Sequence, residues 1–213
     1  ILINSTDDGI NAAGGNDGSS NDWMPGFGGQ GMARPGGMGT TTTGNYYLKI
    51  LNGFIYIDAL GDGIDINGYI EMSGGTLIIN GPTSDNEGPI DYDSSFSISG
   101  GTLIAVGSSG MAQAPSSTST QYSVSLSLST KQTAGQLITI QDSNGNTVVS
   151  IRPTKTYQCL IYSSANLNQA TYNLYIAGTN TGNLEHSIYQ NGTYQNGTLY
   201  GTFTISNIVS AFR

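Results

Sequence analysis

Charged side chains are scarce in this chain of 213 residues, because Asp, Glu, Lys and Arg together make up only 9% of it. Ordinary globular domains carry about 25%. The six Lys and Arg residues are outnumbered by fourteen Asp and Glu residues, which leaves a net charge of −8, and no basic cluster occurs. A chain of this charge repels phosphate backbones, so the sequence argues against nucleic-acid binding.

Long hydrophobic runs, cysteine and histidine are equally scarce. No stretch approaches the ~20 consecutive apolar residues of a membrane-spanning helix, so we expect no membrane span. The single cysteine, Cys159, cannot form an internal disulfide and lies in an alternating run, where we interpret it as a small buried hydrophobe. The single histidine, His186, is interpreted as a surface or turn residue. The sequence does not indicate an oligomeric state.

Glycine and small polar residues take the place of the missing charges. The chain contains 31 Gly, and Ser, Thr and Asn supply most of its polarity. This composition favours short strands joined by glycine turns. We therefore expect an all-β, extracellular protein, either secreted or at the cell surface.

The charge divides the chain into two parts. Residues 1–115 hold twelve acidic against two basic residues, a net charge of −10, whereas residues 116–213 have a net charge of +2. Glycine is also more frequent in residues 1–115 than in residues 116–213. We predict a boundary near residue 115 and expect the unusual chemistry in the acidic part.

The acidic part contains an internal repeat. Three segments superpose with offsets of 22 and 26 residues, namely 48–57, 70–79 and 96–105. A second block repeats beside it at 8–11, 62–65 and 88–91. Each unit is typical of a short strand, a glycine turn and two further short strands, which favours the coils of a parallel β-helix over a leucine-rich repeat. Equivalent positions would then stack about 4.8 Å apart.

A Gly/Met/Pro-rich tract at residues 12–45 interrupts the first coil. It has no periodicity, so we interpret it as a loop insertion, either a decoration or a functional loop. Trp23 and Phe27 make the functional alternative concrete, because a flat aromatic side chain can stack on a sugar ring.

Residues 116–213 are predicted to form an antiparallel β segment that caps the solenoid. Alternating or apolar runs predict strands at 123–128, 137–140, 148–151, 157–162, 172–176 and 201–205. Asn144-Gly145 lies between the second and third of these and indicates a hairpin. A cap of this kind would protect the open edge of the stack.

The candidate metal ligands lie in the acidic turns of the repeat. Stacking places Asn11, Asp65 and Asp91 in one column, with Asp8 and Asp62 in the next and Glu87 one position away. Stacked carboxylates repel one another, and a cation would relieve that repulsion. Oxygen ligands without histidine favour calcium over zinc or copper. The alternative is that these Asp and Asn residues serve only as turn formers.

The order of motifs resembles a bacterial carbohydrate-binding family. The motifs are Asp-Gly-Ile-Asn-Ala-Ala-Gly-Gly at 8–15, the Gly/Met/Pro-rich insert, Gly-Asp-Gly-Ile-Asp-Ile-Asn-Gly at 61–68, Gly-Gly-Thr-Leu at 74–77 and 100–103, and Gly-Met-Ala-Gln-Ala-Pro at 110–115. Thr171-Tyr172-Asn173-Leu174-Tyr175 is similar to the family's C-terminal part. The family consists of secreted, calcium-containing, right-handed parallel β-helices with an architecture similar to that of pectate lyases, and its members bind cellulose and pectin-like polysaccharide.

The resemblance implies a fold, a cofactor and a partner for this chain. It implies a right-handed parallel β-helix of three short strands per coil, and calcium on Asp8, Asn11, Asp62, Asp65 and Asp91, with Glu87 as a further ligand. Gly88 departs from the pattern, because Asp8 and Asp62 stand at the equivalent positions. The implied partner is a polysaccharide, polygalacturonate or pectin and also cellulose, with Trp23, Phe27 and Lys49 as candidate contacts.

Two other classes of function stay open. A polysaccharide lyase needs a base beside a polarised carboxylate, and Lys49 is the one candidate base on a predicted strand. A purely structural adhesin would use the repeats only as a stiff spacer. Because no Arg or His accompanies the acidic turns, we favour a binding protein and assign no catalytic residue.

Overall fold

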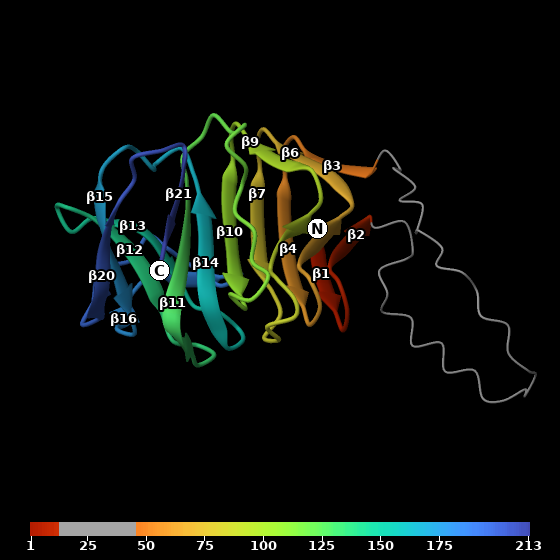
Figure 1. The fold of residues 1–213 in the computed structure, drawn as a ribbon. Coiled ribbons are helices and arrows are strands. Elements are labelled where there is room, and N and C mark those ends of the chain that lie inside the picture. The colour runs from red at the N-terminus through yellow and green to blue at the C-terminus, as the bar shows by residue number, and fades with distance from the viewer. Residues whose placement is uncertain (13–45) are drawn as a thin grey trace, which may run out of the picture.

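A computed structural model describes residues 1–12 and 46–213 of the chain. In this described part every regular element is a strand (Figure 1), which confirms the predicted all-β class. None of the described residues forms a helix long and apolar enough to cross a membrane. The predicted insertion at 12–45 lies outside the described residues except for Ala12, and Trp23 and Phe27 lie outside them too.

Parallel strands in three stacks make up the first part of the chain. The first stack consists of β1 (Leu2–Ser5), β4 (Phe54–Ala59), β7 (Thr76–Asn80) and β10 (Thr102–Gly107). The second consists of β2 (Ile10–Ala12), β5 (Ile64–Ile66) and β8 (Asp91–Tyr92), and the third of β3 (Tyr46–Ile50), β6 (Gly68–Met72) and β9 (Ser95–Ile98). The chain visits the three stacks in the same order on each pass, and β10 begins a fourth pass.

The register of these strands confirms the offsets of the repeat. Leu48 pairs with Ile70 and Ile70 with Phe96, as the superposed segments predicted. Ile55 pairs with Leu77, which lies opposite Leu103. The inward-facing positions of successive passes bury apolar side chains against one another, which stabilises the stack.

The space between the three stacks is filled by apolar side chains. Ile50, Met72 and Ile98 are register partners in the third stack and are buried, and Ile64 and Ile90 of the neighbouring turns and strands are buried as well. Leu77 and Leu103 reach the same cluster from the first stack. Alternation along the strands therefore turns one face of every stack toward this core.

Glycine allows the turn that leads from the third stack back to the first. Gly53, Gly75 and Gly101 occupy equivalent positions and have φ values of 94°, 80° and 91°. Residues that carry a side chain rarely adopt this left-handed backbone region, whereas glycine does so readily. The turns also hydrogen-bond to each other, since Thr76 N donates to Gly53 O at 2.8 Å.

The first stack continues into the C-terminal part of the chain. β14 (Tyr157–Ser163) pairs antiparallel with β10, β11 (Ser123–Gln132) pairs antiparallel with β14, and β21 (Val209–Phe212) pairs parallel with β11. The result is one seven-stranded sheet, in which β14 lies between β10 and β11 (Figure 1). The C-terminal part thus covers the edge of β10.

A second large sheet packs on the outer face of the first. It contains β17 (Asn183–Glu185), β18 (Ile188–Gln190), β13 (Thr147–Ile151), β12 (Ile138–Asp142), β15 (Thr171–Ile176) and β20 (Thr198–Thr204). β16 (Thr179–Asn180) and β19 (Tyr194–Gln195) form a small ribbon. Ile104 and Val106 point away from the inner core and join a second cluster with Ile138, Ile140 and Leu174. The C-terminal part therefore lies over a face of the stack as well as its edge.

All six predicted strands of the C-terminal part are present. The Asn144-Gly145 hairpin joins β12 to β13, with Gly145 at φ 84°. Cys159 is fully buried, as expected, and burial raises the pKa of its thiol to about 12. The short strands β16, β17, β18, β19 and β21 were not predicted, because none carries a clear alternating pattern.

Candidate metal centre

Three carboxylates converge where the chain crosses from the first stack to the second. Asp8 lies in the turn between β1 and β2, Asp62 between β4 and β5, and Glu87 between β7 and β8. One oxygen from each of the three lies within 4.8 Å of the others. Because the turns belong to successive passes, the stacking of the repeat itself brings the three side chains together.

A ladder of backbone hydrogen bonds orients the two aspartates. Asp62 N donates to Asp8 Oδ1 at 2.8 Å, and Gly88 N donates to Asp62 Oδ1 at 2.6 Å. Each aspartate therefore holds the turn of the next pass with one oxygen. Gly88, which lacks a carboxylate, ends this ladder, and Glu87 beside it supplies the third carboxylate in its place.

Asn11 connects the aspartates of this surface. Its Nδ2 donates to Asp8 Oδ2 at 2.7 Å and to Asp65 Oδ2 at 3.2 Å. Asp65 is only 9% exposed and lies beside Asp91 in the register of β5 and β8. Asn11, Asp65 and Asp91 thus form the predicted column next to the triad, and the amide is the neutral member that separates two carboxylates.

Burial and like charge both disfavour ionisation in this cluster. The pKa of Asp62 is raised to about 7, mainly by burial and also by the negative charges of Glu87 and Asp8, although the Gly88 N–H acts in the opposite direction. Burial also raises the pKa of Glu87, with Asp8 and Asp7 adding to the effect. The pKa of Asp91 is raised by burial and by Asp93 and Asp8. In all three groups burial is the largest cause and neighbouring negative charge adds to it, so the ionised form is disfavoured here.

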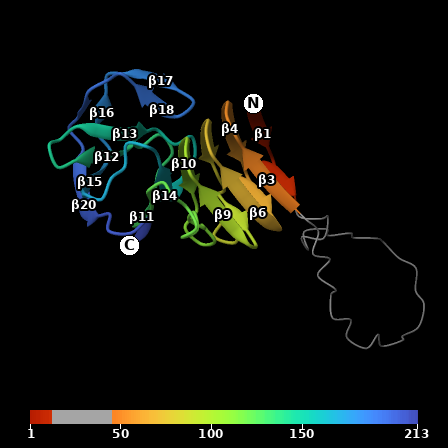
Figure 2. The ribbon, with the colours of Figure 1, turned by 90° about the horizontal axis from the view of Figure 1, so that it is seen from above.

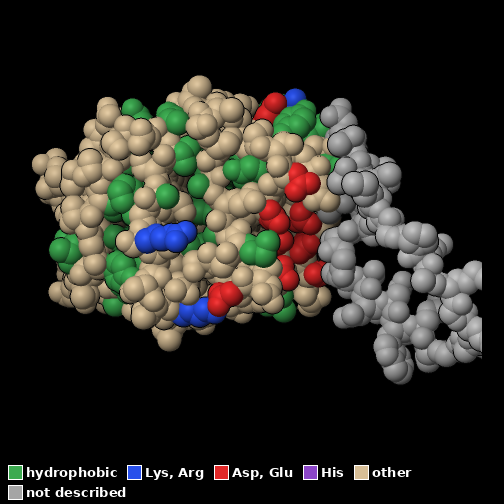
Figure 3. All heavy atoms as spheres, viewed as in Figure 1, with side chains coloured by type: hydrophobic (Ala, Val, Ile, Leu, Met, Phe, Trp, Pro, Cys, Tyr) green, Lys and Arg blue, Asp and Glu red, His purple; other side chains and the backbone are tan. Residues whose placement is uncertain are grey.

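A single divalent cation fits the triad. Two ligands on opposite sides of Ca²⁺ lie roughly 4.6–5.2 Å apart, since each Ca²⁺–oxygen distance is about 2.3–2.6 Å. The 4.8 Å limit on the three carboxylate oxygens meets this requirement. None of the ion pairs among the described residues involves Asp8, Asp62 or Glu87. Figure 3 shows acidic side chains gathered on one side of this face, where Lys and Arg side chains are few.

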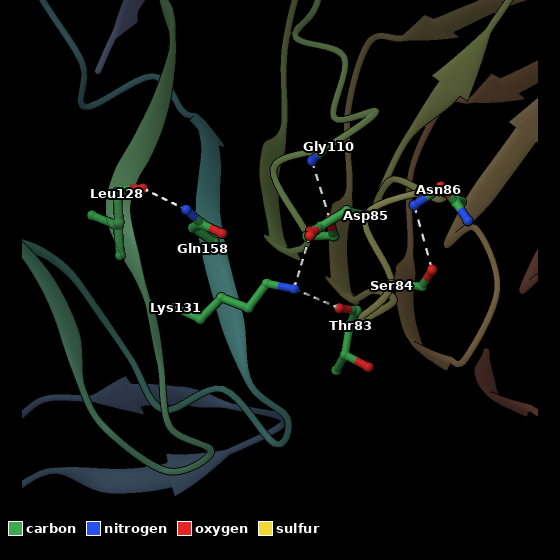
Figure 4. Close-up of polar contacts among 9 residues, drawn as sticks. Thr83, Ser84, Asp85, Asn86, Gly110, Leu128, Lys131 and Gln158 are labelled. Carbon is green, nitrogen blue, oxygen red and sulfur yellow. Dashed lines mark hydrogen bonds and ion pairs between the residues drawn. The ribbon is translucent and has the colours of Figure 1, made fainter.

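The loop that carries Glu87 is anchored to the C-terminal part. Asp85 accepts a hydrogen bond from Ser108 Oγ at 2.8 Å and forms an ion pair with Lys131 Nζ at 3.0 Å. Lys131 also donates to Thr83 O at 3.3 Å. Figure 4 shows Lys131 reaching from β11 toward Thr83 and Asp85. This contact fixes the loop two residues before Glu87.

Lys49 lies apart from the acidic turns, on the outer face of the third stack. Its Nζ forms an ion pair with Glu71 at 2.9 Å and lies 5.6 Å from the ring centroids of Tyr47 and Tyr69. The two rings stack with centroids 5.5 Å apart. Hydrogen bonding and charge attraction from Glu71 raise the pKa of Lys49. The repeat offset of 22 residues could have revealed the tyrosine pair, because Tyr47 and Tyr69 are register partners.

Comparisons of the chain with protein-family models, with curated proteins and with solved structures gave no match. The functional interpretation therefore depends on the geometry of the chain itself.

Proposed function

We propose that this protein binds acidic polysaccharide through calcium held at Asp8, Asp62 and Glu87. The observation that carries the proposal is the convergence of three carboxylates from three successive passes, with no cation among the described residues to balance them. The order in which the chain visits the parallel stacks supports the proposal that the first part is a right-handed parallel β-helix. We further propose that the protein is bacterial and acts outside the cell.

Each residue of the acidic surface has a distinct role in this proposal. Asp8 and Asp62 each use Oδ1 to hold the next turn, and their Oδ2 atoms are the proposed ligands of the ion, although Asp8 Oδ2 also accepts a hydrogen bond from Asn11. Glu87 closes the site from the third pass, and Asn11 keeps Asp8 and Asp65 at a fixed separation. When bound, calcium supplies open coordination positions for the carboxylates of a polymer such as polygalacturonate. Without it, the acidic part repels such a polymer.

The outer face of the third stack offers a second contact for sugar. Tyr47 is 52% exposed and stacks on Tyr69, with Lys49 beside both rings. Aromatic faces and a polar head at one spot suit a neutral sugar such as a glucan chain of cellulose. Trp23 and Phe27 stay predicted contacts, since they lie outside the described residues.

A lyase is less well supported than a binding protein. A lysine that acts as a base needs a lowered pKa, whereas Glu71 raises that of Lys49. Lys49 also lies on β3, in a different stack from the acidic turns. The lyase hypothesis would be supported if the protein released unsaturated uronides and Lys49→Ala abolished that release. If the protein bound no polysaccharide at all, the structural adhesin would be the favoured hypothesis.

The decisive experiment measures binding to polygalacturonate with and without calcium. We expect binding to require calcium, to weaken with salt and to fall when the polymer is methyl-esterified. Asp62→Asn should reduce binding about tenfold or more, because it removes a charged ligand of the ion at nearly constant volume. Asp142→Asn is the matched control, since it removes one carboxylate in the β12–β13 hairpin.

Undiminished binding by folded, chelator-treated protein would overturn calcium bridging. Equal loss in both variants would show that net charge, and not the site, controls binding.

A further inference from the structure

A hairpin from the C-terminal part lies over the outer face of the first stack. β17 and β18 form the hairpin, and the His186 ring at its tip packs on Phe54 and Tyr56, with centroids 4.8 and 5.2 Å apart. Figure 2 shows β17 and β18 on the side of the molecule where the N-terminus lies. Phe54 and Tyr56 of β4 and His186 of the C-terminal part thus form one aromatic cluster.

The tip of this hairpin is a two-residue turn with positive φ at both residues. His186 and Ser187 have φ values of 47° and 70°, although neither is glycine. Two contacts hold the tip: Arg152 N donates to Ser187 O at 2.7 Å, and Asn80 Nδ2 donates to Ser187 Oγ at 3.0 Å. Positive φ at both residues is typical of the type I′ turn of a two-residue hairpin, and these contacts fix the place of the His186 ring.

Beside the tip lies an open hollow of about 650 Å³. Its lining includes Tyr56, Gly135, Arg152, Leu184 and His186. We call it the Arg152 hollow. A smaller hollow of about 290 Å³ also includes His186 and is lined by Glu185, which does not line the Arg152 hollow. A negatively charged ligand in the Arg152 hollow therefore meets no lining carboxylate.

Arg152 is the distinctive group of this hollow. Its side chain is exposed and takes part in none of the ion pairs among the described residues. In contrast, Lys49, Lys131 and Lys155 each pair with a carboxylate. In a protein of net charge −8, a guanidinium without such a partner, facing a hollow, is available to a carboxylate from outside.

We propose that the Arg152 hollow binds one carboxylated sugar residue without calcium. The guanidinium takes the carboxylate, and the Tyr56, His186 and Leu184 side chains contact the apolar face of the sugar ring. The choice of a sugar acid over other carboxylates rests on the proposed function. The site itself does not, because it shares no residue with the acidic triad.

The test is a titration with trigalacturonate in the presence of chelator, followed by NMR. We expect saturable shifts at the Arg152 hollow, about tenfold weaker binding for Arg152→Gln, and a smaller loss for Arg152→Lys, which keeps the charge but not the fork. Arg213 also forms no ion pair but lines a smaller hollow of about 130 Å³, so Arg213→Gln removes the same charge from a different site and should bind normally. A neutral glucose trisaccharide should not bind.

Three outcomes would overturn the proposal: no shifts at the hollow, equal affinity in Arg152→Gln with an unchanged melting temperature, or equal binding of inorganic phosphate, which would mark a general anion site. The two proposals fail separately. If calcium-dependent binding of the polymer is absent but trigalacturonate still binds, only the calcium bridge is excluded. If the polymer binds with calcium but trigalacturonate does not bind in chelator, only the Arg152 hollow is excluded.

Discussion

At Asp62, burial and neighbouring negative charges both disfavour the ionised carboxylate. It is partly buried among Asp8, Glu87 and Asp91, and its pKa is raised to about 7. A carboxyl group with this pKa carries a proton in about half of the molecules at neutral pH, and a bound cation would replace that proton. Proton and cation therefore compete for the same oxygens, which makes the acidic triad sensitive to both.

The pH dependence of stability should report this competition. The pKa of Asp62 is about 7 in the folded chain and near 4 in the unfolded chain, so the folded state binds the proton more tightly. The resulting stabilisation is complete below about pH 4 and is lost as the pH rises through about 7. We expect the melting temperature of chelator-treated protein to rise as the pH falls from 8 to 5, and calcium to flatten that change.

Asp62→Asn provides the control, since it removes the titrating group. Its melting temperature in chelator should exceed that of the wild type at pH 8 and change less with pH. A chelated wild type whose melting temperature is constant over this range would contradict the raised pKa.

The ligand positions could be predicted from sequence only where the repeat is regular. Asp8 and Asp62 are at equivalent positions of the repeat, and so are Asn11, Asp65 and Asp91. Glu87 was less well defined, because an insertion precedes it and backbone geometry decides where its side chain points. Arg152 and His186 have no repeat partner, so their proximity depends on how the second sheet packs on the first.

At the scale of elements, the loop between β7 and β8 links the two parts of the molecule. Glu87 belongs to the acidic triad, and Asp85 in the same loop is tied to Lys131 of β11. The pair with Lys131 lowers the pKa of Asp85. A contact on the C-terminal part therefore helps to position a candidate metal ligand.

Lys131→Met should loosen this loop without unfolding the protein. An exposed ion pair contributes at most about 1 kcal/mol, so we expect calcium affinity to fall by up to about fivefold. Titration calorimetry with calcium measures the change. Lys49→Met breaks a comparable exposed pair on the third stack and serves as the control. Equal affinities in the two variants would mean that the loop does not depend on Lys131.

At the scale of the whole molecule, strand β10 of the seven-stranded sheet is buried on both faces. Leu103 and Ala105 face the inner core, while Ile104 and Val106 face the second sheet. A strand buried on both faces reads as a continuous apolar run, and 103–106 is such a run. The sequence thus contained a sign of the second sheet's position, but periodicity alone could not distinguish a covered face from an exposed one.

Ile104→Ala should destabilise both parts together. Truncation of this fully buried side chain leaves a cavity between the sheets and costs about 2–5 kcal/mol. Native-state hydrogen exchange should show faster exchange in β7 and in β12 alike. Leu199→Ala, at a side chain that is 52% exposed, should have little effect. Faster exchange in only one part would show that the two parts unfold independently.

The position of β14 between β10 and β11 has a consequence for synthesis. β11 ends at Gln132 and leaves the ribosome before β14, which ends at Ser163, yet β11 joins the sheet only through β14. At about 5–20 residues per second, the free edge of β10 and the apolar strand β11 stay unpaired for on the order of a few seconds. Unpaired edges attract other strands, so translation through this stretch is the interval in which a nascent chain is most exposed to pairing with its neighbours on a polysome.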